Sequence, residues 1–311
     1  YSGIADNEED FYLTIQRGVA YKMKLDSLAN RISFNRLDPL SADSTSYQFI
    51  NPFVMDENND DICYMAAGNK LWRNNKLSSI PYNDEHFRND IGWTTYTDGA
   101  FNQAMDITCI STSVNPPNIV YYGTDSKYIH RIDSANVGDP PHIAITNIPT
   151  GSGVHCSSIA IHPDNPDIIL VVFSNYNTYS LFYSEDAGNN WSKVAGNLEE
   201  NPSGSGNGPS CRSAQIIPLG NTTLYLVGTS VGLFGTNNLD GTNTKWELVS
   251  PDVIGNVIVE QIDYRYSDNR LTVATYGNGI YQTTINGLSG ILSENSDNLI
   301  EFNIKPNPAS E

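Results

Sequence analysis

The chain is poor in positive charge and has no long apolar run. Lysine and arginine together number 17 against 35 aspartates and glutamates, which gives a formal net charge of −18. An acidic surface repels phosphate backbones, so nucleic-acid binding is not expected. No stretch of roughly 18 apolar residues occurs, so no membrane span is predicted. The simplest interpretation of the acidity is that it keeps an extracellular protein soluble.

Familiar motifs for metals, phosphates and nucleophiles are also missing. The sequence has no C-x-x-C pair, no H-E-x-x-H, no G-x-S-x-G and no phosphate-binding glycine loop. The acidic stretch from Asp56 to Asp61 offers hard oxygen ligands for calcium. It lacks the glycine and the ordered ligand spacing of an EF-hand loop, so a solvated turn and no cofactor are expected, with calcium as the alternative.

What the chain does have is a repeated strand pattern. An apolar strand that ends in Gly or Thr is followed by a short turn and a second strand, and most copies also have a preceding strand and a later strand with a Trp. Four strands per repeat of roughly 45–60 residues are typical of β-propeller blades. The strand pairs begin at Phe11, Ile62, Ile119, Ile168, Leu224 and Leu271, and Trp93, Trp191 and Trp246 open the fourth strands.

These repeats predict an all-β propeller of four-stranded antiparallel blades, about six or seven in number, over residues 1–287. The chain begins at Tyr1 without a signal peptide, so we expect sequence to be missing at both ends and the propeller to be N-terminally incomplete. The last repeat, Ile258 to Ile285, has no evident fourth strand. We therefore expect the strand that closes it to come from elsewhere in the chain.

The four cysteines test how the repeats align. Cys109, Cys156 and Cys211 each precede a proline by seven residues, which predicts equivalent places on the innermost strands. The aligned places in other blades hold Ile50 and Ile258. Equivalent sites in neighbouring blades are too far apart for a disulfide, so these three cysteines and Cys63 are predicted to be buried free thiols.

One hairpin carries a recognisable motif. Ser184, Asp186, Gly188 and Trp191 stand at the positions of S-x-D-x-G-x-x-W. This pattern resembles the Asp-box, or BNR repeat, of sialidases, sortilin-like receptors and family 74 glycoside hydrolases. Asp186 is expected to accept turn amides, Gly188 to take positive φ and Trp191 to anchor the turn in the core. A degraded copy extends from Thr236 to Trp246, around Asp240.

Further segments between about residues 105 and 286 resemble the same propellers. Ala160 to Pro166 is similar to the strand and turn before an Asp-box blade, and Ala274 to Tyr281 is similar to the strand pair that ends such propellers. An Asp-box is a structural turn, so this resemblance implies a fold and specifies no ligand.

The tail suggests export. Residues 288–298 are polar and are interpreted as a linker. The following segment, with Pro306, Asn307 and Pro308, resembles the start of the C-terminal sorting domain of the type IX secretion system of Bacteroidetes. That resemblance implies the secretion machinery as a partner and an extracellular or outer cell-surface location, with 288–311 as linker and truncated sorting domain.

Two kinds of function remain open. The first is a non-catalytic module that recognises a glycan or protein, with the tyrosines Tyr176, Tyr179 and Tyr183 as a possible stacking surface for sugars. The alternative is a family 74-like hydrolase of β-glucan or xyloglucan, which needs two carboxylates across a cleft. Asp106 and Asp263 are the candidates, since each is expected near the start of an innermost strand. A sialidase is disfavoured because the chain has no Arg-Ile-Pro segment.

Overall fold

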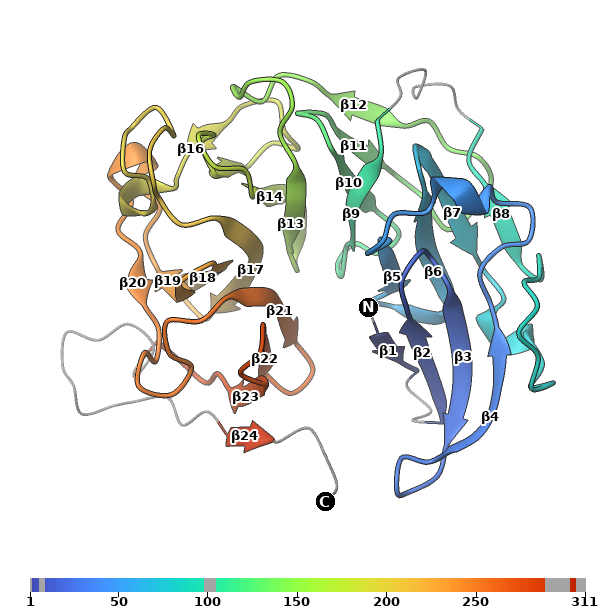
Figure 1. The fold of residues 1–311 in the computed structure, drawn as a ribbon. Coiled ribbons are helices and arrows are strands. Elements are labelled where there is room, and N and C mark those ends of the chain that lie inside the picture. Colours follow the sequence, from blue (N-terminus) through green and yellow to red (C-terminus); the bar gives the residue numbers. More distant parts are fainter. Residues whose placement is uncertain (1, 6–8, 98–104, 289–302, 306–311) are drawn as a thin grey trace. The chain divides into compact units, whose positions relative to one another are not determined.

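The repeated strand pairs form six four-stranded antiparallel sheets. They are seen in a computed structural model that describes residues 2–5, 9–97, 105–288 and 303–305 (Figure 1). The chain divides into two compact units, Tyr1–Thr146 and Asn147–Glu311, with three sheets in each. The fold class is therefore confirmed: the protein is an all-β propeller with six described blades.

The first unit holds three blades in chain order. Each blade is a meander in which consecutive strands pair. Their strands are β1 Ser2–Ile4, β2 Asp10–Thr14, β3 Ala20–Leu25 and β4 Arg31–Arg36; β5 Phe53–Asp56, β6 Asn59–Ala67, β7 Lys70–Asn74 and β8 Trp93–Thr95; and β9 Ile107–Thr112, β10 Val120–Thr124, β11 Ile129–Ile132 and β12 Ile143–Ile145. Short 3-10 turns occupy Ser44–Ser46 (η1) and Leu77–Ser79 (η2).

The second unit repeats this plan. Its strands are β13 Cys156–His162, β14 Asn165–Phe173, β15 Leu181–Ser184 and β16 Ser192–Lys193; β17 Cys211–Leu219, β18 Thr222–Thr229, β19 Gly232–Thr236 and β20 Glu247–Leu248; and β21 Val259–Arg265, β22 Arg270–Thr275, β23 Ile280–Thr284 and β24 Asn303–Lys305. The 3-10 turns η4 and η5 cover Gly196–Leu198 and Gly241–Asn243. Strand β24 supplies the fourth strand of the last blade by pairing with β23.

The cores lie between neighbouring blades. In the first unit, Tyr12 and Ala20 of the first blade pack in one cluster with Phe53 and Met65 of the second. In the second unit, another cluster joins the last two blades, for example through Leu226 and Val273. Within each unit, neighbouring blades therefore bury apolar side chains against one another, and this burial drives folding.

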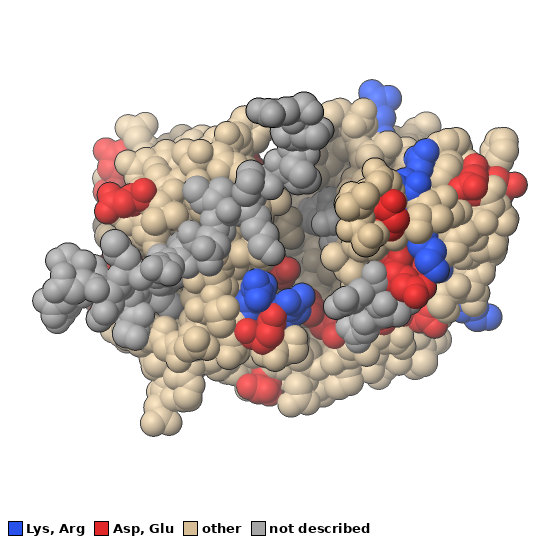
Figure 2. All heavy atoms as spheres, turned by 90° about the horizontal axis from the view of Figure 1, so that it is seen from below, with Lys and Arg blue, Asp and Glu red and all other residues tan. Residues whose placement is uncertain are grey.

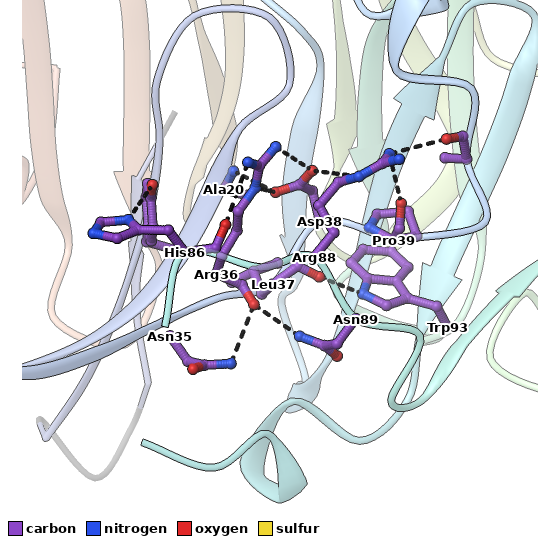
Figure 3. A network of polar contacts seen from close by, with 12 residues as sticks. Ala20, Asn35, Arg36, Leu37, Asp38, Pro39, His86, Arg88, Asn89 and Trp93 are labelled. Carbon is purple, nitrogen blue, oxygen red and sulfur yellow. Dashed lines mark hydrogen bonds and ion pairs between the residues drawn. The ribbon is translucent and has the colours of Figure 1, made fainter. Parts of the chain in front are cut away.

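A loop of the second blade also covers the outer edge of the first. Backbone bridges join Asn35 to Glu85 and Pro39 to Asn89. The carboxylate of Asp38, which is fully buried, accepts the Arg36 guanidinium at 2.7 Å and the Ala20 amide at 3.3 Å. Figure 3 shows Arg36 and Arg88 approaching Asp38 from either side. The loop, through its backbone bridges, covers the edge strand β4, which would otherwise expose unpaired backbone groups.

All four cysteines are free and buried, as predicted, but the alignment behind that prediction was partly wrong. The proline spacing matches the register of Cys156 and Cys211 but not that of Cys109, and Pro163 lies in the turn after β13 whereas Pro218 lies within β17. Ile50 is 71% exposed and lies outside any strand. The residues that share one register, each fully buried beside a shift in strand pairing, are Ile107, Cys156, Cys211 and Val259.

Cys109 therefore stands two residues further along its strand than the alignment required, and Val259, not Ile258, is the equivalent in the last blade. Cysteine at this register replaces a branched apolar side chain. Burial raises the pKa of the Cys211 thiol to about 12, so the group stays protonated and unreactive at neutral pH.

Candidate functional site

The second unit contains a pocket of about 310 Å³ beside the Ser184–Trp191 hairpin. It lies between the outer strands of two neighbouring blades, β13–β16 and β17–β20. One wall is the β15–β16 hairpin, and the other is the loop between β19 and β20. The lining residues are Tyr183, Ser184, Glu185, Asp186, Asn190, Trp191, Ser192, Val194, Leu239 and Gly241.

Hydrogen bonds within the turn hold the first wall rigid. The Asp186 carboxylate accepts the Asn190 amide N–H at 2.8 Å and the Asn190 side-chain N–H at 2.6 Å. The Ser184 hydroxyl donates to Asp186 at 2.9 Å and accepts the Gly188 N–H at 2.9 Å. Gly188 has φ of 85°, a conformation that favours glycine. The turn therefore presents Trp191 from a fixed backbone.

Three tryptophans stand at the start of the fourth strand of their blades. Two of them are buried. Trp93 and Trp246 are 7% and 3% exposed. Trp93 donates its indole N–H to the Leu37 carbonyl at 2.6 Å, and Trp246 donates to the Val194 carbonyl at 2.8 Å. Both acceptors directly follow the outer strand of the preceding blade, β4 or β16. These two rings are committed to packing between blades.

Trp191 differs from these two rings. It is only partly buried, so the expectation that it anchors the turn in the core was wrong. Its indole N–H reaches the side chain of Asn147 at 3.3 Å, and Asn147 in turn donates to the Asn189 carbonyl at 2.8 Å. The ring is thus held at its edge while it lines the pocket. A fixed, partly exposed aromatic ring is a feature of binding surfaces.

The pocket wall is acidic and polar. Glu185 is exposed, and its carboxylate accepts the Tyr183 hydroxyl at 3.2 Å. Hydrogen bonds from Asn190 lower the pKa of Asp186, so this side chain is a carboxylate at neutral pH. Burial is the main reason that the pKa of Tyr183 is raised, so its hydroxyl keeps its proton and can donate.

Two arginines elsewhere in this unit are engaged in ion pairs. Arg212 contacts Glu260 at 3.0 Å, and Arg265 contacts Asp268 at 2.6 Å. Figure 2 shows acidic side chains at many separate places on one face of the molecule, in keeping with the net charge. Acidic side chains are therefore not peculiar to the pocket. What distinguishes the pocket is its cavity and its aromatic lining.

The structure separates the three tyrosines that could have formed a stacking surface. Tyr176 is 61% exposed, whereas Tyr179 is buried with the Lys193 ammonium 4.8 Å from its ring centre. Only Tyr183 lines the pocket. Trp191 lines the same pocket, a place that sequence reasoning missed because it assigned that ring to the core, while the Tyr183 ring itself packs edge-on against Tyr225.

The two carboxylates considered for glycoside hydrolysis belong to different units. Asp106 lies just before β9 in the first unit, is exposed, and donates its backbone N–H to the Asp125 carboxylate at 3.0 Å. Burial and the nearby Asp125 raise the pKa of Asp106. Asp263 lies in the second unit, well inside β21, so its expected place near the strand start was wrong. Their use in hydrolysis stays a prediction.

The acidic stretch Asp56 to Asp61 covers the end of β5, a two-residue turn and the start of β6. Asp56 is buried and accepts the Asn58 amide at 3.0 Å, and Asp61 accepts the Ser78 amide at 2.7 Å. Over the described ranges, no three acidic, histidine or cysteine side chains gather as a metal site would require. Calcium binding at this turn stays an untested alternative.

The residues proposed as a sorting signal, Pro306, Asn307 and Pro308, lie outside the described residues. Comparison with known proteins adds no assignment, because neither a protein family model nor a curated protein matches the chain. In the part of the chain that the structure describes, no helix is long and apolar enough to cross a membrane. The geometry of the pocket is therefore the main guide to function.

Proposed function

We propose that the protein is a non-catalytic recognition module that binds a saccharide in the pocket beside the Ser184–Trp191 hairpin. The observation that carries the proposal is the placement of Trp191. Equivalent rings in two other blades are buried, whereas this ring is partly exposed and lines a pocket. The likeness of the hairpin to an Asp-box supports the blade architecture and leaves the ligand open.

The chemistry of the lining suits a sugar ring. The apolar face of a pyranose can stack on an indole, and the Tyr183 ring offers a second apolar surface. Hydroxyl groups of the sugar can donate to the carboxylates of Glu185 and Asp186 and exchange hydrogen bonds with Asn190 and Ser192. The volume falls at the lower end of the roughly 300–1,000 Å³ typical of small-ligand pockets.

We further propose that this recognition takes place outside the cell. The tail that resembles a type IX sorting domain and the acidic composition support export to the medium or the outer cell surface. The experiment is to follow the full-length protein in a Bacteroidetes host with and without a functional type IX translocon. Retention only in the host that lacks the translocon is expected, and equal secretion in both would contradict export by this route.

Calorimetric titration of short oligosaccharides tests binding. Trp191→Ala is expected to weaken binding about tenfold or more, because it removes the stacking surface. Tyr176→Ala is the matched control, since Tyr176 is an exposed aromatic residue outside the pocket lining. Equal affinity of wild type and Trp191→Ala would contradict the proposed site. Release of new reducing ends that is lost in Asp106→Asn or Asp263→Asn would replace the binding function with hydrolysis.

A further inference from the structure

The charges around the pocket narrow the class of ligand. Glu185 and Asp186 line it, and no lysine or arginine does. The ammonium of Lys193, on the adjacent strand, lies over the ring of the buried Tyr179 instead. On the facing loop, Asp240 stands between the lining residues Leu239 and Gly241 and adds a negative charge, while the exposed Lys245 of the same loop lies outside the lining. A ligand in this pocket therefore meets carboxylates without a compensating cation in the lining.

From this arrangement we infer that the pocket prefers a saccharide that carries a protonated amine, that is, an amino sugar whose nitrogen is not acetylated. This inference rests on the proposed saccharide-binding function and names the class of its ligand. An ammonium group can lie over the indole face of Trp191 and be attracted by the ring. It can also donate to the Glu185 carboxylate, which accepts one hydrogen bond from Tyr183 and has several acceptor positions.

The two carboxylates have different parts in this preference. Asp186 is tied into the turn through Ser184 and Asn190, so it contributes a fixed negative charge and a rigid wall. Glu185 is exposed and outside that network, except for its contact with Tyr183. Glu185 is thus the side chain that can be changed without dismantling the turn. An anionic sugar would be repelled by both groups, and an N-acetylated sugar would lose the charge attraction.

Calorimetric titration with three oligosaccharides of equal length tests the inference. The probes are oligomers of glucosamine, of N-acetylglucosamine and of a uronic acid, at low salt and near-neutral pH. The glucosamine oligomer is expected to bind about threefold to fivefold more tightly than the N-acetylated one, and the uronic-acid oligomer most weakly. Added salt should reduce the preference, because it screens exposed charges.

Glu185→Gln provides the decisive variant. It should bring the affinity ratio of the glucosamine and N-acetylglucosamine oligomers close to one, while Asp252→Asn, an exposed carboxylate outside the lining, should keep the wild-type ratio. Equal binding of both oligomers by the wild type, or an unchanged ratio in Glu185→Gln, would overturn the inference and leave saccharide binding intact. Failure of all three oligomers to bind would instead overturn the proposed function itself, and the inference with it.

Discussion

Two neighbouring hairpins in the second unit use the same residue type for different purposes. In the β15–β16 hairpin a tight turn held by Ser184 and Asp186 leaves Trp191 partly exposed beside a pocket. In the β19–β20 hairpin a longer loop brings Trp246 into the core, where it is 3% exposed. The shorter turn therefore leaves its aromatic ring partly exposed, and the longer loop buries its ring between blades.

Contacts around Trp246 explain its burial. The Asn197 side chain accepts the Trp246 amide at 2.7 Å and donates to the Trp246 carbonyl at 3.0 Å. The indole N–H ends on the Val194 carbonyl of the preceding blade. Among the described contacts, no side chain bonds both the amide and the carbonyl of Trp191 in this way. The indole N–H of Trp191 donates to the side chain of Asn147.

Replacing each ring by alanine gives the largest expected contrast. Trp246→Ala should lower the free energy of unfolding by about 3–5 kcal/mol, because it empties a packed site between blades. Trp191→Ala should cost about 1 kcal/mol, because the ring buries less apolar area. Denaturant unfolding followed by circular dichroism measures both. Equal losses of unfolding free energy would show that the two rings contribute equally to stability, which would contradict the contrast.

Alanine substitutions at Gly196 and Gly188 compare the backbone constraints next to the two hairpins. Gly196 has φ of 51°, and a Cβ there would lie 1.8 Å from the Thr244 carbonyl oxygen of the facing loop. Gly196→Ala is therefore expected to cost about 3 kcal/mol, from the clash and the left-handed conformation together. Gly188→Ala should cost about 1 kcal/mol because of its positive φ. A reversed order in thermal unfolding would contradict the packing described between these blades.

Loss of the Asp186 side chain should lower the free energy of unfolding by an amount that depends on pH. Asp186 is hydrogen-bonded and its folded-state pKa is lowered, so its stabilising effect is present above the ordinary aspartate pKa and is lost as pH falls through the lowered value. The stability difference between wild type and Asp186→Ala should thus shrink in acid. Asp240→Ala is the control, since the Asp240 side chain does not cap the turn that follows it. A constant difference at all pH values would contradict this role.

The smallest effect is expected at Asn147. Asn147→Ala removes the acceptor that holds the Trp191 ring edge, so oligosaccharide affinity should fall about twofold to threefold through lost preorganisation. The denaturation midpoint should change little, because the bond is exposed. An affinity equal to that of the wild type in calorimetry would show that the ring needs no such support.

Much of the fold could be predicted because strand periodicity and turn residues repeat six times. The pairs that begin at Ile62, Ile119, Ile168, Leu224 and Leu271 all form second and third strands of blades. The register of the cysteines was missed because a proline spacing does not reveal bulges, which shift one strand against its partner. Strand β24 could not be assigned from its own residues, because its pairing with β23 depends on tertiary contact.

The candidate site was only half predictable. The residues of the turn motif indicated the hydrogen bonds of Asp186 and the positive φ of Gly188, because both follow from local chemistry. Whether Trp191 packs or lines a pocket depends on the facing loop of the next blade, whose Leu239 and Gly241 line the same pocket. That is a long-range relation, and a motif of eight residues does not contain it.

The most direct test of the account follows the four indole N–H resonances of 15N-labelled protein during titration with a glucosamine oligomer. The account predicts that the Trp191 resonance shifts with saturation while those of Trp93 and Trp246, buried between blades, stay in place. Assignment comes from the single tryptophan-to-phenylalanine variants. A titration in which Trp191 does not move, or in which only other tryptophans move, would contradict saccharide recognition at the Ser184–Trp191 hairpin.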